Sequence, residues 1–528
     1  MKRTSATDAG RLDRQILTAM ITSTRFLRDI QDIYSPEFMP GEYGRLVAQW
    51  CINHFQKHKL APGRHIQDYF DRVIREKTVH DKDVLGMIEK LLTGISQDFE
   101  RDGAGLNIDF LLDEAEQWWC RRDLENLSED LRQTIENAGP EEARELLKRH
   151  VAVQRAGRDG FNPFRELNRL DTALEYAPTP LLYFPGALGQ LLNRFMVRES
   201  LIGIMGPEKR GKSFWLTEFL LRSCIARNNT ALFEVGDMTE SQYLPRLFSR
   251  VTGLPPSRDD LGENEVPELD CFNNQRDTCS SPNRMGCGPC IREEGYEGKI
   301  DAKEVPPGYK PCHYCSFEGT DYLPAILYRN VKMTQELTGD LARQMADKIN
   351  RRMGDRQLMV SMHPNFSINV AGIRQVLDRW KDRDGFIPDV IIIDYADILL
   401  PEQKGQDERE AQNERWAMLR QLSQVYHCLV VVATQTNRAS YSAETITDEM
   451  SSEDKRKLAH VVGMLGLHRW KDEQSEKVMR LSWVLHRGTR YSVRDQVVCL
   501  QDLARCNPVV DSYWRPRRIG PRAAAKPD

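Results

Sequence analysis

The stretch GPEKRGKS, residues 206–213, constrains the fold of this chain more than any other feature. It satisfies the pattern G-x-x-x-x-G-K-[ST], and it lies between an apolar run, LIGIM, and a helix-like stretch, FWLTEFLLRSCIA. Between a strand and a helix, glycines let successive backbone N–H groups point at phosphate oxygens, and the start of the helix adds its positive dipole. A glycine-containing surface turn is the alternative, but the pattern arises by chance in only about one chain in a hundred of this size. We therefore expect a phosphate-binding P-loop.

This loop predicts the binding of ATP together with Mg²⁺. Lys212 would neutralise the β- and γ-phosphates, and the hydroxyl of Ser213 would be a ligand of the magnesium ion. The residues expected to contact the nucleotide are Gly206, Pro207, Glu208, Lys209, Arg210, Gly211, Lys212, Ser213 and Phe214.

Short apolar runs alternate with helix-like stretches around and after the P-loop. The runs are LIGIM, TALFEV, QLMVSM, DVIIIDY and CLVVVAT. Uninterrupted apolar strands separated by helices indicate a mostly parallel sheet covered on both faces, which is an α/β fold. Three later runs, GMLGLHRW, VMRLSWVLHRG and VVCLQDL, predict further strands whose parallel or antiparallel pairing stays open.

The chain of 528 residues is too long for one ordinary domain. Its first part carries apolar residues at three- and four-residue spacing, as in RLDRQILTAMITSTRFLRDI, which is typical of amphipathic helices. We expect an all-α N-terminal domain at 1–100, a helical linker region at 101–180, an ATPase core at 181–515 that contains a cysteine-rich insertion at 255–325, and a disordered basic tail at 516–528.

Polar side chains at the ends of the predicted strands would complete a hydrolytic site. Asp394 ends the run DVIIID, where a carboxylate can hold magnesium, although capping of the next helix is an alternative role. Asp397, further along, is expected to face solvent. Gln435, after CLVVVAT, could touch the γ-phosphate and report its loss. The residue that activates the attacking water is expected at the end of the strand TALFEV, where Glu234 and Asp237 are both candidates.

The net charge of −4 is nearly balanced, so composition alone does not indicate a nucleic-acid-binding protein. Any contact with nucleic acid has to come from a local patch or from the assembly of several copies. No run of about eighteen apolar residues occurs, and the N-terminal stretch MKRTSATDAGRLDRQ lacks the apolar core of a signal peptide. We therefore expect a cytoplasmic protein without a membrane contact.

Six of the twelve cysteines crowd into the stretch from Cys271 to Cys315. Cys287 and Cys290 form one Cys-x-x-Cys pair, and 21 residues separate it from the pair of Cys312 and Cys315, which is close to zinc-ribbon spacing. Each pair can direct two thiolates at one tetrahedral zinc ion. The spacing therefore predicts a structural Zn²⁺ site.

Two details of this segment stay open at the level of sequence. Cys271 and Cys279 could replace one pair, form a second site with His313, or remain free thiols. Disulfide bonds are the alternative to zinc, and a reducing cytoplasm argues against them.

The order of these parts resembles the DnaB-type hexameric replicative DNA helicases, whose motor is a RecA-like core. The resemblance rests on the helical N-terminal part, the P-loop, EVGDMT, VIIIDYADIL, VVVATQTNR and VLHRGTR, and it covers most of the chain. It implies a RecA-like core, a ring of six subunits, an assembly role for the N-terminal domain, and ATP-driven movement along single-stranded DNA that unwinds forked duplex. A loader or a primase is an implied partner. The family does not ordinarily carry a cysteine-rich insertion at this point.

The resemblance also implies roles for individual residues. Asp237 stands where the family has a glutamate that acts as catalytic base. Arg487 in VLHRGTR corresponds to an arginine that enters the ATP site of the neighbouring subunit, with Arg490 in reserve, while Leu485 replaces a lysine of the family. The residues expected to act in catalysis are Lys212, Asp237, Asp394, Gln435 and Arg487.

Two loops of the family line the path of the DNA, and they correspond to PEQKGQDEREAQNER and NRASYSAETITDEMSSEDKRK. Lys404, Arg409, Arg438 and Lys455 are candidate phosphate contacts, with solvated loop charges as an equal alternative. Two functions of another class stay open. One is a RecA-like or clock-type ATPase that remodels DNA or protein without unwinding, and the other is an ATP switch in a defence or loading complex.

Overall fold

The computed structural model divides into two compact units. The first unit comprises Met1–Ala177 with Asp378–Ile387, and the second comprises Pro178–Leu377 with Pro388–Asp528. The residues described are 6–31, 33–39, 41–76, 82–102, 106–137, 139, 142–143, 146, 164, 174, 178–236, 238–293, 296, 298–316, 322–403, 405–436, 446, 455–488 and 491–515. The expected basic tail at 516–528 lies outside them, as does most of the expected linker region beyond residue 146. Among the described helices, none combines the length and apolar character needed to cross a membrane.

The first unit is helical, as the spacing of its apolar residues predicts. Its elements are α1 (Ala6–Thr22), α2 (Thr24–Ile30), η1 (Pro36–Phe38), α3 (Glu42–His58), η2 (Gly63–His65), α4 (Ile66–Glu76), α5 (Lys82–Asp102) and α6 (Ile108–Asn137). Trp119 of α6 is fully buried, and its ring centroid lies 5.6 Å from that of Tyr34 and 6.4 Å from that of Phe38. The start of α6, which we expected within a linker region, therefore contributes to the core of this helical unit.

The second unit is built on a nine-stranded sheet in the order β11-β10-β9-β8-β1-β7-β6-β2-β5. Its strands are β1 (Leu201–Gly206), β2 (Thr230–Val235), β5 (Leu358–His363), β6 (Val390–Asp394), β7 (Leu429–Gln435), β8 (Gly463–His468), β9 (Val478–His486), β10 (Val497–Asp502) and β11 (Asn507–Trp514). All pairings from β8 through β5 are parallel, whereas β9, β10 and β11 pair antiparallel. The predicted mostly parallel sheet is confirmed, and the pairing left open for the last strands is resolved.

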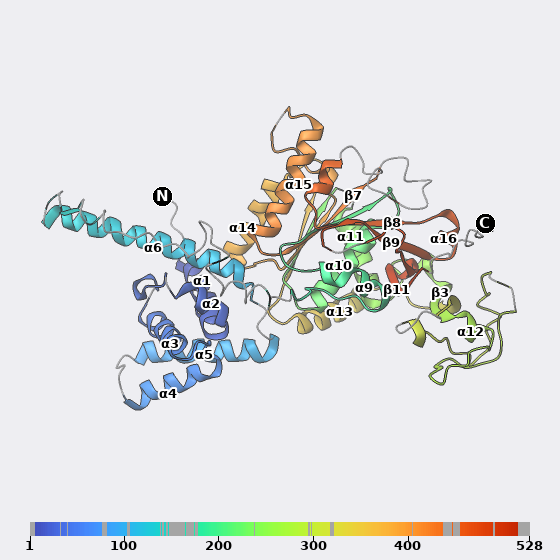
Figure 1. Ribbon diagram of the computed structural model, residues 1–528, viewed down its shortest axis with the longest axis horizontal. Helices are drawn as coiled ribbons and strands as arrows, with labels where there is room; N and C mark the ends of the chain where they lie inside the picture. The colour runs from blue at the N-terminus through green and yellow to red at the C-terminus, as the bar shows by residue number, and fades with distance from the viewer. Residues whose placement is uncertain are drawn as a thin grey trace, which may run out of the picture. The chain divides into compact units, whose positions relative to one another are not determined.

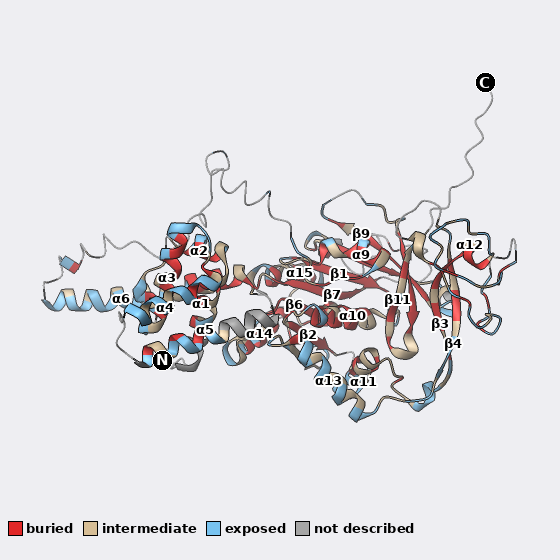
Figure 2. Cartoon of the chain, turned by 90° about the horizontal axis from the view of Figure 1, so that it is seen from below, coloured by how far each residue is buried: buried red, intermediate tan, exposed pale blue. Residues whose placement is uncertain are grey.

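Helices cover both faces of this sheet. Ile202 and Ile204 of β1 belong to the same core cluster as Trp215 of α10 (Lys212–Ile225). Gly203, between them, points to the other face, where an added Cβ would stand 3.6 Å from Trp416 of α15 (Glu408–Val425). Alternate residues of a strand serve opposite faces, so an unbroken apolar run is what such a strand requires. Figure 1 shows α10 and α15 on opposite sides of the sheet, and Figure 2 shows the central strands buried.

The other described helices of the second unit are α9 (Gly186–Leu192), α11 (Glu240–Thr252), α13 (Gly339–Met353), the short α16 (Lys471–Ser475) and the first part of α14 (Val370–Asp384), whose residues from Asp378 onward belong to the first unit. A mostly parallel sheet that carries a P-loop and is flanked by helices fits the RecA-like class of α/β folds that we expected.

The cysteine-rich segment leaves the core between α11 and α13. It is carried by an antiparallel hairpin of β3 (Gly262–Cys271) and β4 (Pro324–Met333), and it contains the short α12 (Phe272–Gln275). Strand β4 runs past the expected end of the insertion at residue 325. Leu269 packs in one cluster with Val498 and Leu500 of β10. The hairpin is therefore mounted on the antiparallel end of the nine-stranded sheet.

This insertion has a polar core centred on Asp270, which is 0% exposed. The carboxylate accepts hydrogen bonds from the Tyr309 hydroxyl at 3.0 Å, the Asn274 amide at 3.0 Å and the backbone N–H of Cys312 at 2.8 Å. Burial, followed by the nearby Asp270 charge, raises the pKa of Tyr309, so its hydroxyl remains a donor at every physiological pH. The buried charge of Asp270 thus organises the loops around the cysteines.

Candidate functional site

Polar residues from four parallel strands meet at the carboxyl edge of the sheet. Gly206 of β1 pairs with Gln435 of β7, and Glu234 of β2 pairs with Asp394 of β6. In the strand order β7 lies between β1 and β6, so Gln435 rather than Asp394 takes the place next to the P-loop strand. The region outside the carboxyl ends of parallel strands is where open α/β sheets bind their ligands. This edge is therefore the candidate nucleotide site.

The P-loop curls tightly between β1 and α10. Gly211 has φ +88° at the N-cap of α10, and Lys209 also lies in the left-handed region at φ +57°. Lys212, the first residue of the helix, folds back over the loop, and its Nζ donates to the carbonyl oxygens of Gly206 at 2.9 Å and Pro207 at 3.0 Å. The ammonium group therefore lies inside the curve of the loop, where a P-loop lysine meets phosphate oxygens.

The other loop residues divide by exposure. Gly206 and Pro207 are buried, Glu208 and Lys209 are exposed, and Arg210 through Phe214 are half-buried. Arg210 reaches across to β8 and donates to the backbone carbonyl of Arg469 at 2.8 Å. Burial, with Arg210 as the second cause, lowers the pKa of Arg469. No motif in the sequence indicates Arg469, because only the pairing of β8 with β1 brings it beside the P-loop.

Asp394 and Glu234 lie side by side at the ends of β6 and β2, and they are 3% and 1% exposed. Glu234 accepts a hydrogen bond from the backbone N–H of Met238 at 3.1 Å, so it holds the start of the connection to α11. Burial is the main cause that raises the pKa of Tyr243 on α11, and the charges of Glu234 and Asp394 add to it. Asp237, the expected catalytic base, lies outside the described residues.

Asp397 does not face solvent as we expected. It is half-buried, and its carboxylate accepts hydrogen bonds from the Thr434 hydroxyl at 2.9 and 3.0 Å and from the backbone N–H of Gln435 at 2.7 Å. The physical reason is the turn η6 (Ala396–Ile398), which brings Asp397 to the end of β7. Lys457 is fully buried and donates to the Thr434 hydroxyl at 2.9 Å and to the carbonyl of Gln435 at 3.4 Å. No pattern in the sequence singles out Lys457.

Arg487 lies at the opposite edge of the sheet from the P-loop. It directly follows β9, whose last residue, His486, pairs with Gly463 at the start of β8. The backbone N–H of Arg487 donates to Val462 at 2.8 Å, and its exposed side chain donates to the carbonyl of Ala459. Since β1 has six residues, about 17 Å of strand separates this edge from the P-loop of the same chain.

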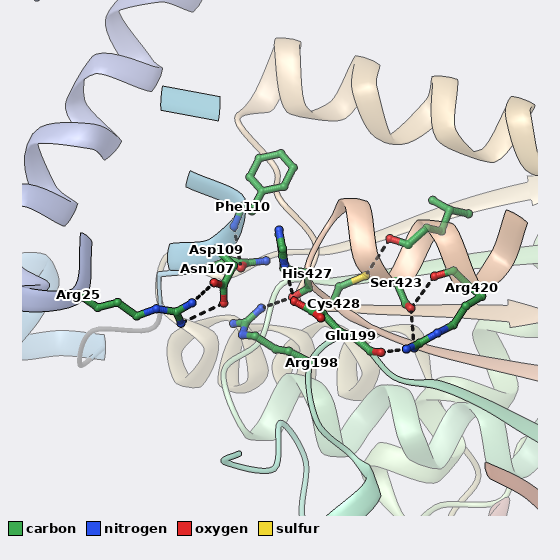
Figure 3. A network of polar contacts seen from close by, with 11 residues as sticks. Arg25, Asn107, Asp109, Phe110, Arg198, Glu199, Arg420, Ser423, His427 and Cys428 are labelled. Carbon is green, nitrogen blue, oxygen red and sulfur yellow. Dashed lines mark hydrogen bonds and ion pairs between the residues drawn. The ribbon is translucent and has the colours of Figure 1, made fainter. Parts of the chain in front are cut away.

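A polar network occupies the same amino-terminal edge of the second unit. Arg198 donates to the carbonyl of His427 at 3.0 Å, and Nδ1 of His427 lies 2.6 Å from a carboxylate oxygen of Glu199 (Figure 3). Arg420 of α15 donates to the Glu199 carbonyl. Burial first, and then the charge of Arg487, lower the pKa of Arg420. Arg420 therefore lies close enough to Arg487 for their charges to interact, at the edge of the sheet opposite the P-loop.

The chain brings the two Cys-x-x-Cys pairs together through its backbone but does not gather their sulfur atoms. Cys287 and Lys310 form an antiparallel bridge with backbone bonds of 3.2 and 2.8 Å, which places the two segments side by side. Cys312 is buried, while Cys287 and Cys290 are exposed. Within the part of the chain that the structure describes, no three cysteine sulfur atoms lie within 4.8 Å of one another. The donors and their backbone pairing fit zinc, and side-chain rotation would have to bring the sulfur atoms together.

Cys271 ends β3 and is buried, and Cys279 is half-buried; both are free thiols, so their assignment stays open. Of the expected DNA contacts, Arg409 is exposed at the start of α15. Lys455 is the first residue of η9 (Lys455–Ala459). Lys404, Arg438 and the reserve arginine Arg490 lie outside the described residues.

No known protein-family profile matches the sequence, and no curated protein matches it. Among solved structures, "ATPase Domain of G40P" is similar at 10% identity and a TM-score of 0.42, covering 66% of this chain and 97% of that chain. "The Structure Of A DnaB-Like Replicative Helicase And Its Interactions With Primase" is similar at 10% identity and a TM-score of 0.42, covering 94% of this chain and 98% of that one.

The position of Lys212 gives a direct test of the nucleotide site. The Lys212→Ala substitution is expected to lower kcat for ATP hydrolysis by about a hundredfold or more, because the charge that stabilises the transferred phosphoryl group is lost. Steady-state phosphate release measures the effect. Lys348→Ala, on the exposed surface of α13, removes the same charge elsewhere and is the matched control. Near-normal turnover in Lys212→Ala would refute the assignment of the P-loop.

Proposed function

We propose that the protein is an ATP-driven, ring-forming DNA helicase of the replicative type. The observation that carries the proposal is the division of polar groups between the two edges of one sheet. Lys212, Asp394 and Gln435 lie at the carboxyl edge, and Arg487 lies at the other. One chain therefore offers half of an ATP site at each edge, and copies arranged head to tail would complete the sites between them.

The residues of the carboxyl edge suit the hydrolysis of a phosphoanhydride bond. Lys212, already inside the loop, would exchange its two carbonyl partners for β- and γ-phosphate oxygens. Ser213 and Asp394 would hold a magnesium ion, whose charge offsets the charge on the phosphate oxygens. Gln435, directly beside Gly206, would contact the γ-phosphate and sense its release.

We assign the catalytic base to Asp237 and a supporting role to Glu234. The buried Glu234 carboxylate is engaged with the backbone N–H of Met238, next to Asp237 in the chain, so it can fix the conformation of that turn. Glu234 lies near the end of β2, where it pairs with Asp394 of β6, and Asp237 comes two residues after this strand in the sequence. Glu234 is the alternative candidate for the catalytic base.

Arg487 would act on the ATP bound to the neighbouring subunit. Its own P-loop lies about 17 Å away along the strands, which is beyond the reach of an arginine side chain. A head-to-tail interface between copies brings the amino-terminal edge of one sheet to the carboxyl edge of the next. The hexameric ring, with residues 1–100 as assembly domain and 181–515 as motor core, is part of this proposal.

Single-stranded DNA is the proposed track of the motor. With a net charge of −4 a single copy has little general attraction to DNA, but six copies around one strand would present repeated local cations such as Arg409. A loader or a primase is proposed as a further partner, as the resemblance in sequence implies.

Unwinding of a forked DNA tests the function as a whole. We expect ATP-dependent displacement of a labelled strand by the wild-type protein and none by Lys212→Ala, since movement requires hydrolysis. Images of particles formed with ATP and single-stranded DNA should show a six-fold ring. ATP hydrolysis without strand displacement would favour the other class of function, an ATPase that remodels DNA or protein.

Mixing two inactive variants tests the shared ATP site. Lys212→Ala and Arg487→Ala are each expected to lose ATPase activity. After subunit exchange, about a quarter of the interfaces in an equal mixture would combine an intact P-loop from one chain with an intact arginine from the other. Turnover should therefore reappear in the mixture. A mixture of Lys212→Ala with the double variant is the control, and an inactive equal mixture would exclude action of Arg487 across subunits.

We also propose a structural zinc ion in the insertion, held by Cys287, Cys290, Cys312 and Cys315. Four thiolates would close the coordination shell, so a structural role suits the site better than a catalytic one. The antiparallel bridge between Cys287 and Lys310 supports the proposal, because it aligns the two pairs.

Metal analysis of the purified protein checks the zinc proposal. We expect one zinc per chain, and less than about half an equivalent would contradict it. Cys287→Ser should lower the zinc content, because one of four ligands is lost. Cys428→Ala, in the buried core of the second unit, is the matched control and should keep the metal.

A further inference from the structure

The buried ammonium group of Lys457 is not used by the proposed chemistry. Its side chain is 0% exposed, and Nζ donates to the Thr434 hydroxyl at 2.9 Å and to the carbonyl of Gln435 at 3.4 Å. A buried cation is costly unless polar partners replace its hydration. Lys457 is therefore held in place by its contacts with the last residues of β7.

The directions of the hydrogen bonds in this network follow from the chemistry of its members. An ammonium group only donates and an ionised carboxylate only accepts, so the Thr434 hydroxyl accepts from Lys457 and donates its single proton to Asp397. Asp397 also accepts from the backbone N–H of Gln435 at 2.7 Å. Protons are therefore donated in one direction, from Lys457 through Thr434 to Asp397. Cooperative hydrogen bonds of this kind rigidify the groups that they connect.

The network connects three segments that are distant in sequence. Asp397 lies in η6, immediately beyond Asp394; Thr434 and Gln435 end β7 beside Gly206; and Lys457 lies in η9. The Lys457 side chain therefore connects η9 to the end of β7.

We propose that Lys457 is a positioning residue that, through Thr434 and Asp397, keeps Gln435 and Asp394 in place at the P-loop. This inference deepens the proposed function and rests on its assignment of the carboxyl edge as the ATP site. The proposed ATP site assigns Lys457 no contact with nucleotide or magnesium. Its loss should change the chemical step more than the binding of ATP.

Lys457→Met tests the proposal, because methionine keeps the length of the side chain and removes the charge. We expect kcat for ATP hydrolysis to fall about tenfold while KM for ATP changes less than about twofold. Lys457→Arg keeps a donor cation and should recover part of kcat.

Lys477→Met is the matched control. Like Lys457, Lys477 donates to a side-chain oxygen, Asn264 Oδ1 at 3.0 Å, and to a backbone carbonyl, although its side chain is half-buried rather than fully buried. It lies at the insertion hairpin and has no contact with β7, so its substitution should leave kcat unchanged. An equal loss of kcat in both lysine variants would overturn the assigned role of Lys457.

Thr434→Val keeps the proposal testable if Lys457→Met does not fold. Valine preserves the shape of threonine and removes the hydroxyl that links Lys457 to Asp397, so kcat should fall with little change in KM. Where both single variants fold, the double variant should be no slower than the worse single one, because both act through the same network. Additive losses, or an unchanged kcat in a folded variant, would overturn the proposal.

Lys212→Ala separates failure of this inference from failure of the proposed function. Normal ATP turnover in Lys212→Ala would contradict the assignment of the ATP site, and the positioning role of Lys457 would be contradicted together with it. Loss of turnover in Lys212→Ala together with wild-type kinetics in Lys457→Met would overturn the positioning role alone.

Discussion

The parallel pairing of β1 with β7 is the interaction on which the candidate site depends. It sets Gln435 directly beside Gly206, where the P-loop leaves the sheet. The next pairing, of β7 with β6, carries Asp394 to the same edge, about 10 Å from β1. A triphosphate laid along this edge can therefore contact residues from three strands, each fixed by backbone hydrogen bonds that are buried on both faces of the sheet.

Much of this arrangement can be predicted from sequence, because it depends on local patterns. The P-loop is recognised by residue types at fixed spacings. The apolar runs that become β1, β2, β6 and β7 predict a sheet covered by helices on both faces. Asp397 and Lys457 could not be predicted in the same way. The direction of Asp397 follows from one turn of η6, and the contact of Lys457 with Thr434 joins residues whose proximity only the folded chain determines.

The cysteine-rich insertion illustrates the same limit. Spacing alone indicates four thiols suited to one ion, yet it does not reveal the β3–β4 hairpin or the buried carboxylate of Asp270 at its centre. That carboxylate binds the backbone N–H of Cys312, so the loop that bears the second cysteine pair is fixed by a hydrogen bond as well. The insertion therefore has a framework of its own on which a metal site can be completed.

The location of Arg487 at the far edge of the sheet gives each subunit a front and a back. In the proposed ring, a structural change caused by hydrolysis at one interface would be transmitted to the next interface through stiff, hydrogen-bonded strands rather than through flexible loops. Such a chain of contacts runs in one rotational sense only, because the interface between neighbours is not symmetric. The orientation of a single β-hairpin, β8 with β9, would thus determine the order in which the sites around the ring hydrolyse ATP.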